Sequence, residues 1–481
     1  LVWPMGWVSM RRILLRSGEQ MTGQTADVVI CGAGIAGISA AYHLSVKKGV
    51  KNILIVDERP PLTLTSDKST ECYRNWWPGP GDAMVRFMNR SIDLLETMAS
   101  ETGNLFNLNR RGYLFLTADR ERADTLSSHA REISHMGAGP LRVHDGRSYV
   151  PDYHLSSEHN WEAQPQGADL LLDPTDITSH YPFVTEDVVA ALHTRRCGWF
   201  SAHQLGMYML EEALNHGARL IKARVAGVTL RGGRLRAVRI RSSEGDYHVD
   251  TDAFVVAAGP YVRDIASMLG VDLPVFNELH VKVGFRDHLG VVPRTAPMMI
   301  WSDPVALPWS KDERMELESD SDTRWLLQDF PSGVHFRPEG GADSSVLLML
   351  WTYDVHPVEP VWPPQFDPIY AEVVLRGLSR MIPGLCAYLG RTSRPAVDGG
   401  YYCKTRENRP LVGPLPVDGT FIIGALSGFG QMASQAAAEL LATHVVGDEP
   451  PSYASAFHLA RYDDPGYQAL LDNSDATDGQ L

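Results

Sequence analysis

The sequence predicts an α/β fold that contains a Rossmann-type dinucleotide-binding unit. Two observations carry this prediction. A glycine-rich turn lies between two short, fully apolar runs, and a single acidic residue ends the second run. Near the middle of the 481-residue chain, further apolar runs alternate with glycine-containing turns, which is typical of a β-meander.

The first apolar run, residues 28–30, has the composition of a strand that is buried on both faces. The motif G-x-G-x-x-G follows at residues 32–37, and apolar residues then recur at helical spacing. Residues 53–56 form the second buried strand, which ends on Asp57. The glycines therefore lie between a strand and a helix, which is the context that a dinucleotide-binding turn requires.

Each part of this unit has a physical role. Gly32 allows a tight turn, Gly34 lets the backbone approach a pyrophosphate, and Gly37 lets the helix lie close to the strand. The helix N-terminus offers free N–H groups and its positive dipole end to the phosphates. Asp57 is spaced to accept both hydroxyls of an adenosine ribose, and its charge disfavours NADP. The residues expected to hold the cofactor here are Gly32, Ala33, Gly34, Ile35, Ala36, Gly37, Asp57 and Glu58.

A segment rich in hydroxyl groups, residues 63–74, follows the second strand. Its hydroxyl side chains lie beside Lys68 and Arg74, a composition that suits phosphate oxygens. Alone, such a segment is better explained as a capped surface loop. After a dinucleotide-binding unit we favour contact with the cofactor phosphates. The residues expected to make this contact are Ser66, Ser69 and Thr70.

Composition and charge limit the classes of protein. The chain has 44 basic and 58 acidic residues, hence a net charge of −14, and 44% of its residues are apolar. These values exclude disorder as the main state and argue against nucleic acid or an anionic membrane as the main partner. No apolar run reaches the roughly 20 residues of a membrane span. Five widely spaced cysteines without C-x-x-C favour a reducing, cytoplasmic location.

The chain resembles the D-amino-acid oxidase superfamily of FAD-dependent oxidoreductases, and within it the glycine oxidase and sarcosine oxidase branch. Four blocks carry the resemblance, in the family's order. They are the glycine-rich unit with the hydroxyl-rich segment, GWFSAHQLGMYMLEEALNHGARLI at residues 198–221, residues 223–262 from ARVAGVTL to FVVAAGPYV, and residues 405–447 from TRENRPLVGP to FIIGALSGFGQMASQAAAELLATHVVG. Their residue patterns independently predict a helix, a β-meander and a strand–turn–helix in the last three blocks.

The resemblance implies a Rossmann-type FAD-binding domain interleaved with an α+β substrate domain that has a mainly antiparallel sheet. The FAD-binding domain is expected in residues 25–104, 196–275 and 401–450, and the substrate domain in residues 105–195 and 276–400. Residues 1–24 are expected to be an extension outside the fold, and residues 451–481 an acidic C-terminal tail.

The third and fourth blocks are expected to supply further contacts to FAD. Val225 would hold the adenine through its backbone. The turn before the last long helix would aim the helix N-terminus at the flavin pyrimidine and stabilise negative charge there. The further residues that the resemblance implies are Val225, Ala258, Gly259, Gly424, Gly428, Gly430, Gln431 and Met432.

Three departures from the family pattern bear on cofactor attachment and substrate. The Cys that attaches the flavin in sarcosine oxidases falls at Gly400 here, and residues 63–70 contain no His for a histidyl attachment. We therefore expect non-covalent FAD. Met432 and Met349 stand where those oxidases carry lysines for the substrate carboxylate and for the reaction with oxygen. Both absences weaken the prediction of a small amino-acid substrate and of a fast oxidase.

Tyr402 is the first candidate for a catalytic residue in contact with substrate, because it precedes the TRENRPLVG block that lies beside the flavin in the family. Tyr401, His280 and Lys282 are weaker candidates. The alternative is that Tyr402 is a core residue, which is the commoner role of a single buried tyrosine.

The leading hypothesis is an FAD-dependent oxidoreductase that oxidises a C–N bond of an amine or amino acid by hydride transfer to flavin N5, giving an imine that hydrolyses. Its partners would be a small-molecule substrate and either oxygen or an electron carrier. Two alternatives stay open: a 2-hydroxy-acid or polyol dehydrogenase on the same fold, and a non-catalytic flavoprotein that acts as an assembly factor. No metal site is indicated.

Overall fold

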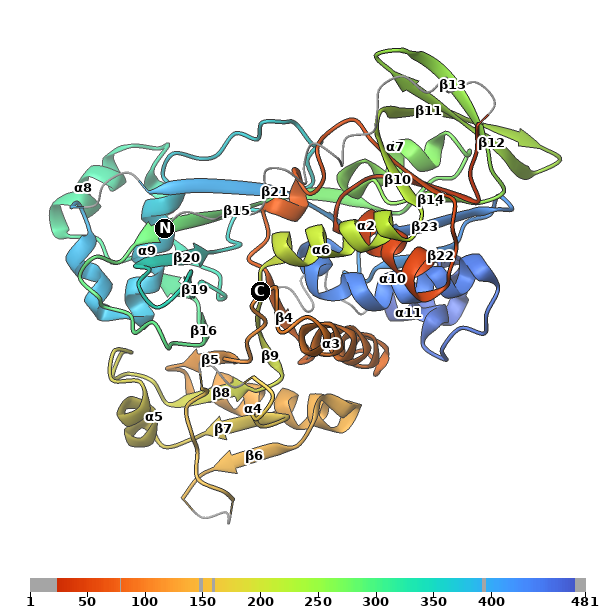
Figure 1. Cartoon of the computed structure of the whole chain (residues 1–481). Coiled ribbons are helices and arrows are strands. Elements are labelled where there is room, and N and C mark those ends of the chain that lie inside the picture. The colour runs from red at the N-terminus through yellow and green to blue at the C-terminus, as the bar shows by residue number, and fades with distance from the viewer. Residues whose placement is uncertain (1–23, 78, 147–149, 158–160, 392–394, 472–481) are drawn as a thin grey trace.

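A computed structural model describes residues 24–471, apart from residues 78, 147–149, 158–160 and 392–394. The chain forms two large sheets, which lie in different halves of the molecule (Figure 1). The six-stranded sheet has the order β10-β3-β2-β14-β23-β22. The nine-stranded sheet has the order β21-β15-β20-β19-β16-β5-β8-β7-β6.

The six-stranded sheet contains both strands of the predicted dinucleotide-binding unit. Every neighbouring pair in it is parallel except β22 with β23. Its central strands are almost fully buried, as their apolar runs predict for a sheet that is covered on both faces, while the edge strand β10 is mostly half-buried. The strands are β2 (Val28–Cys31), β3 (Ile53–Asp57), β10 (Ala218–Lys222), β14 (Phe254–Val256), β22 (Leu411–Pro414) and β23 (Thr420–Gly424).

Two different layers cover this sheet. Val28 and Ile30 share an apolar core with α2 (Ile35–Tyr42), α3 (Ala83–Glu101), α6 (Ala202–Asn215) and α10 (Gly430–Val446). Val29 and Leu54 point to the other face, because side chains alternate along a strand. There they pack with the predicted meander, β11 (Arg224–Arg231), β12 (Arg234–Ser242) and β13 (Gly245–Asp250), and with α7 (Val262–Ser267). The strand β1 (Gln24–Thr25) pairs with β13, and the rest of the expected extension lies outside the described residues.

The nine-stranded sheet is mixed but mainly antiparallel. Only the pairs β16–β5 and β6–β7 are parallel. On one face it shares an apolar core with α5 (Pro174–His180) and α9 (Tyr370–Met381). Its strands are β5 (Tyr113–Thr117), β6 (Leu141–His144), β7 (Ala168–Leu171), β8 (Ala190–Thr194), β15 (Phe276–Arg286), β16 (Met298–Trp301), β19 (His335–Glu339), β20 (Val346–Leu350) and β21 (Ala396–Lys404).

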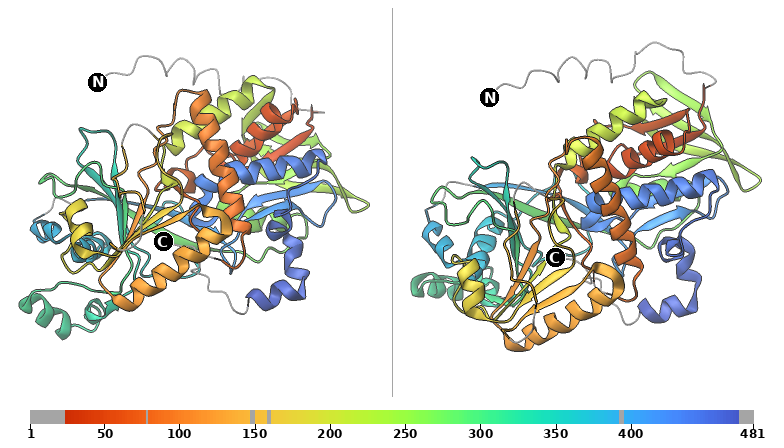
Figure 2. Two further views of the ribbon diagram at one scale, coloured as in Figure 1. Left: turned by 90° about the horizontal axis from the view of Figure 1, so that it is seen from below. Right: turned by 60° about the horizontal axis from the view of Figure 1, so that its bottom comes forward.

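The remaining elements are shorter or more peripheral. Two further helices are α4 (Arg120–Ile133) and α8 (Lys311–Ser319), and the second carries a complete capping box. The pair β4 (Cys72–Arg74) and β9 (Cys197–Trp199) and the pair β17 (Val305–Ala306) and β18 (Asp329–Phe330) form two small sheets. Figure 2 shows the two large sheets from two further directions, again in different halves of the molecule.

The middle strands of the nine-stranded sheet have one apolar and one polar face. Val283, Met349 and Phe336 lie opposite one another in register and are buried in the core beneath α9. Lys282 and Arg337 alternate with them and donate hydrogen bonds to backbone carbonyls of the hydroxyl-rich segment. Met349 therefore faces away from that segment, so its comparison with a lysine beside the flavin does not hold.

The prediction of an acidic C-terminal tail is wrong for the residues that the structure describes. These form η8 (Ala454–Phe457), η9 (Leu459–Asp463) and α11 (Pro465–Leu471). Arg461 is buried and its Nη2 lies 2.6 Å from Glu407 Oε1, and the hydroxyls of Tyr462 and Tyr467 donate to the same carboxylate. This buried ion pair and the Phe457 side chain attach the segment to the fold despite its acidity. Residues 472–481 lie outside the described part.

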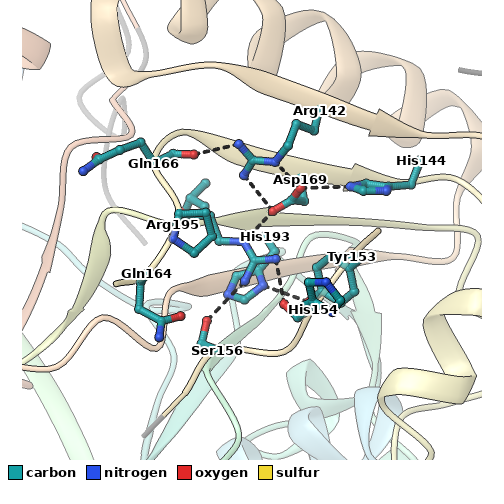
Figure 3. A network of polar contacts seen from close by, with 12 residues as sticks. Arg142, His144, Tyr153, His154, Ser156, Gln164, Gln166, Asp169, His193 and Arg195 are labelled. Atoms are coloured by element: carbon teal, nitrogen blue, oxygen red, sulfur yellow. Dashed lines mark hydrogen bonds and ion pairs between the residues drawn. The ribbon is translucent and has the colours of Figure 1, made fainter. Parts of the chain in front are cut away.

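A buried carboxylate ties together the outer strands of the nine-stranded sheet (Figure 3). Asp169 on β7 accepts hydrogen bonds from Arg142 at 2.6 Å, His144 at 2.9 Å and Arg195 at 2.5 Å. Burial would raise the pKa of Asp169, but the two guanidinium groups and His144 outweigh it and hold that pKa well below its usual range. Arg195 also donates to the carbonyl of His154. The network therefore joins β6, β7, the residue that follows β8 and a connecting segment.

Three findings concern the described residues as a whole. Across the ranges given above, no helix is long and apolar enough to cross a membrane. The five cysteines are free thiols, and four of them are buried. The same residues contain no group of three His, Cys, Asp or Glu side chains that could hold a metal ion.

Candidate active site

A cavity of about 410 Å³ opens at the carboxyl ends of the parallel strands β2, β3, β14 and β23. Ligands of open α/β sheets bind at this edge, because the loops that follow the strands converge there. The hydroxyl-rich segment and β21 of the other sheet also line the cavity. Among the residues predicted from the sequence, those that line it are Gly32, Ala33, Gly34, Ile35, Ala36, Asp57, Glu58, Ser66, Ser69, Val225, Ala258, Gly259, Tyr402, Gly424, Gly428, Gly430 and Gln431.

Close contacts with neighbouring backbone atoms restrict the turn after β2 to a single conformation. Gly32 has a φ of +117°, and a Cβ atom there would clash with the carbonyl of Ala257. A Cβ atom on Gly37 would clash with the carbonyl of Gly32, so Gly37 permits close packing of α2 and does not itself line the cavity. Gly34 does line it, at the start of α2. The turn thus brings backbone N–H groups to the cavity wall.

Asp57 holds this turn from the end of β3. Its Oδ2 accepts a hydrogen bond from the N–H of Ala33 at 2.7 Å, and its Oδ1 accepts one from Arg59 at 2.9 Å. Burial raises the pKa of the Asp57 carboxyl, and these two N–H groups oppose that effect. The carboxylate therefore organises the loop and also lies on the wall of the cavity.

The hydroxyl-rich segment crosses the N-terminus of α2. Ser66 Oγ accepts a hydrogen bond from the N–H of Ile35 at 2.9 Å, which places its hydroxyl where phosphate oxygens are predicted. Thr70 is outside the cavity lining, and its carbonyl accepts a hydrogen bond from Arg337 on the nine-stranded sheet. Lys68 is also outside it and is paired with Asp67 and Asp398.

The turn between β23 and α10 is strained and carries unpaired polar atoms. Ala425 and Ser427 have φ values of +50° and +51°, which cost about 1 kcal/mol or more each for residues with side chains. Ser427 Oγ and Gln431 Oε1 are buried and have no hydrogen-bond partner among the described residues. Strain and unpaired polar atoms at one turn are typical of a ligand site.

The side chain of Met432 does not line the cavity. Met432 is buried in the apolar core of the helices, and its carbonyl accepts a hydrogen bond from Ser91 on α3. The reason is helical geometry: two residues after Gly430, the side chain points toward the neighbouring helix. The predicted contact of Met432 with the cofactor is therefore not supported by its position.

Tyr402 forms the wall of the cavity on the side of the nine-stranded sheet. A Cβ atom on Gly428 would clash with the Tyr402 ring, so the glycine allows this close approach. The Tyr402 ring stacks on His280, with a centroid distance of 4.0 Å and an angle of 15°. Burial raises the pKa of Tyr402 to about 12, so its hydroxyl is protonated at neutral pH.

Behind Tyr402 lies a buried trio of Glu278, His280 and Lys404, of which the sequence indicated only His280. Glu278 Oε2 accepts hydrogen bonds from His280 Nε2 at 3.1 Å and from Lys404 Nζ at 3.0 Å. Burial lowers the pKa of His280, and Lys404 lowers it further while Glu278 opposes both. The available signal was the spacing of Glu278 and His280, which places both on one face of a strand. Lys282 is on the same face but donates to the carbonyl of Ser69.

The loops around the cavity have features that suit a nucleotide cofactor. Two helix N-termini, those of α2 and α10, face one cavity and would stabilise negative charge there. The unpaired Ser427 and Gln431 oxygens supply polar contacts at the end of the cavity beside Tyr402, and Asp57 lines the end beside β3. This arrangement is typical of a dinucleotide-binding protein.

The chain belongs to the DAO family of FAD-dependent oxidoreductases, whose family model matches residues 27–444. FAD is therefore the cofactor of this chain, and the cavity would hold it. Residues Ser427 to Gln431 would lie at its flavin end and the glycine-rich turn at its pyrophosphate.

Curated relatives are distant and are matched only in part. Mitochondrial dimethylglycine dehydrogenase of Rattus norvegicus is 24% identical over 256 residues, which are 53% of this chain and 26% of that protein. D-amino acid dehydrogenase of Vibrio atlanticus is 22% identical over 282 residues, 52% of this chain and 65% of that protein. The matched part thus spans about a quarter of the first relative.

Solved structures match nearly the whole chain. L-proline dehydrogenase from P. horikoshii has a TM-score of 0.68 at 18% identity, covering 92% of this chain and 98% of that one. Glycine oxidase from Geobacillus kaustophilus also has a TM-score of 0.68, at 16% identity, covering 91% of this chain and 99% of that one. At these identities the similarity establishes the fold.

Replacing Asp57 by Ala is expected to weaken FAD binding roughly 10- to 100-fold, because the substitution removes charge-assisted hydrogen bonds to the turn and to the ribose. Titration of the apoprotein with FAD, followed by flavin fluorescence, measures the change. Asp67→Ala is the matched control, since Asp67 is an exposed acid of the neighbouring loop outside the cavity lining. Equal affinities of the two variants would contradict this role of Asp57.

Proposed function

We propose that the protein oxidises a C–N bond of an amine or amino acid, giving an imine that hydrolyses to a carbonyl compound and an amine. FAD, when bound, supplies the hydride acceptor at its N5 atom. The observation that carries the proposal is the strained turn from Ala425 to Gln431, which directs the N-terminus of α10 into the cavity. Such an N-terminus would stabilise the negative charge of the reduced cofactor.

Two side chains at or beside the cavity are uncharged at neutral pH, which suits a reaction without acid–base catalysis. Tyr402 and His280 are both buried, and burial moves the pKa of each in the direction that keeps the group uncharged at neutral pH. If the substrate amine arrives neutral, hydride transfer needs no acid–base pair. The chain then has to position the amine, exclude water and stabilise the charge that develops.

Arg74 supports an amine that also carries a carboxylate. Its side chain is buried, and its guanidinium carbon lies 4.7 Å from the centre of the Trp77 ring. Trp77 in turn contacts Phe429, the residue just before α10, with a centroid distance of 4.8 Å. A buried guanidinium on this side would attract a substrate carboxylate.

The proteins to which the chain is similar favour an amine over a hydroxy acid. The names of the curated relatives specify dimethylglycine, D-amino acids and sarcosine, and those of the solved structures specify proline and glycine. All of these compounds are amino acids or N-methylated amino acids. The hydroxy-acid or polyol dehydrogenase and the non-catalytic assembly factor therefore remain as secondary hypotheses, without an observation of their own.

Several contacts support non-covalent attachment of FAD. A Cβ atom on Gly400 would lie 2.9 Å from Lys68 Cβ, so the space for a flavin-linking side chain at this position is filled. Cys31 and Cys403 line the cavity, but burial raises the pKa of each to about 12. Both are thiols at neutral pH, and a thiol is a poor nucleophile compared with a thiolate.

Anaerobic mixing of the FAD-loaded protein with a panel of amines, amino acids and 2-hydroxy acids tests the reaction class. We expect amines or amino acids to bleach the visible flavin band and hydroxy acids to leave it unchanged, because the site is proposed to recognise nitrogen. The rate of reoxidation in air then separates an oxidase from a dehydrogenase. Bleaching by hydroxy acids alone would refute the proposal. The absence of any bleaching, together with a stable protein partner, would favour the assembly factor.

Replacing Tyr402 by Phe removes only a hydroxyl at the cavity wall. We expect kcat/KM for the best amine of the panel to fall roughly 10-fold, the effect of losing one hydrogen bond to substrate. Tyr401→Phe is the matched control, because the Tyr401 hydroxyl donates to the carbonyl of Val361. If Tyr402→Phe behaves like this control, Tyr402 is a wall of the cavity and not a catalytic residue.

A further inference from the structure

Gln431, the second residue of α10, has a buried side chain that is hydrogen-bonded at one end only. The residue is 3% exposed and lines the FAD cavity. Its Nε2 donates a hydrogen bond to the carbonyl oxygen of Ser66 at 2.8 Å. Because a carbonyl oxygen only accepts, this contact fixes which end of the amide is the nitrogen and leaves Oε1 as an acceptor at the other end.

The Gln431 acceptor has no donor within the part of the chain that the structure describes. Oε1 is buried and makes no hydrogen bond to any of these residues. A buried acceptor without a donor is costly, and most such groups are therefore paired in native proteins. Since the side chain lines the cavity, the missing donor is most simply explained as an O–H or N–H group of the ligand.

The contacts of Ser66 place the Gln431 side chain beside the turn that is expected to hold the pyrophosphate. Ser66 Oγ accepts a hydrogen bond from the N–H of Ile35 at 2.9 Å, at the start of α2. Ser66 therefore contacts the N-terminus of α2 through its hydroxyl and the N-terminus of α10 through its carbonyl. The Gln431 amide is thereby held on the side of α10 that faces the glycine-rich turn.

The residues that precede Gln431 border the expected flavin end of the cavity. Ser427 and Gly428 belong to the same turn, and both line the cavity. A Cβ atom on Gly428 would clash with the ring of Tyr402, which forms the wall there. Gln431 thus lies between the residues expected at the flavin and those expected at the pyrophosphate. In FAD the group that joins these two parts is the ribityl chain, whose carbons carry hydroxyl groups.

We propose that Gln431 Oε1 accepts a hydrogen bond from a hydroxyl group of the ribityl chain of FAD. The other donors of FAD fit this position less well. The adenine amino group and the ribose hydroxyls belong at the end of the cavity that Asp57 lines, and the flavin N3–H group lies in the pyrimidine ring, beyond the ring that carries the ribityl chain. The inference concerns the cofactor and holds whether the substrate is an amine or a hydroxy acid.

Cofactor analogues that each lack one ribityl hydroxyl test this contact. The apoprotein is titrated with FAD and with its 2′-, 3′- and 4′-deoxyribityl analogues, and flavin fluorescence gives the Kd of each. Gln431→Met keeps the length of the side chain and removes both polar atoms. Gln435→Met is the matched control, because Gln435 lies one turn further along α10, contacts His43 at 3.2 Å and does not line the cavity. Far-UV circular dichroism checks that each variant is folded.

In the wild-type protein we expect one deoxy analogue to bind roughly 10-fold more weakly than FAD, the effect of one lost hydrogen bond. Gln431→Met should bind FAD and that analogue equally, and Gln435→Met should retain the difference. Equal Kd values of FAD and every analogue in the wild-type protein would overturn the inference. So would a difference that persists in Gln431→Met or one that also disappears in Gln435→Met. The wild-type comparison needs no variant, so it can overturn the inference even if Gln431→Met does not fold.

Discussion

The close approach of the turn after β2 to its neighbours determines how the cavity is built. Side chains are excluded at Gly32 and Gly37 by backbone carbonyls, and the N–H of Ala33 is held by the Asp57 carboxylate. These contacts leave the start of α2 only one position, with its N–H groups at the cavity wall. Because β14 and β23 end at the same edge, their loops face the same space. The dinucleotide site follows from this packing.

The second large sheet completes the site through a single strand. β21 contacts the loops at Thr65, Gly259 and Ser427, all of which belong to the six-stranded half. The carbonyl of Tyr401 accepts a hydrogen bond from Thr65, and the Tyr402 ring lies against Gly428. His280 on β15 extends the site from this strand, because its ring stacks on Tyr402. Substrate recognition is therefore proposed to come from one half of the molecule and cofactor binding mainly from the other.

The elements that the sequence predicts correctly are those in which every cue is local. The glycine-rich turn, the strand that ends at Asp57 and the meander are each read within about thirty residues, and the family match supports the same assignment. Side-chain direction was harder to predict. Met349 and Met432 occupy the expected elements, but the strand register and the neighbouring helix turn them into apolar cores. Side-chain directions of this kind depend on contacts between residues that are far apart in the sequence.

Long-range pairing also explains what the sequence analysis missed. The acidity of the C-terminal segment predicts a solvated tail, yet the Arg461–Glu407 pair joins residues that lie 54 positions apart. Lys404 and Glu278, 126 positions apart, meet only because β15 and β21 pair in one register. Such pairs can be identified only in the folded chain.

The identity and attachment of the bound cofactor test the central claim most directly. The protein, purified or reconstituted with FAD, is precipitated with acid, and the supernatant is examined by visible absorption and mass spectrometry. The structure predicts a colourless pellet and a yellow supernatant that contains one FAD for each chain. A yellow pellet would contradict non-covalent attachment. A protein that neither contains nor takes up FAD would contradict the assignment of the cavity itself.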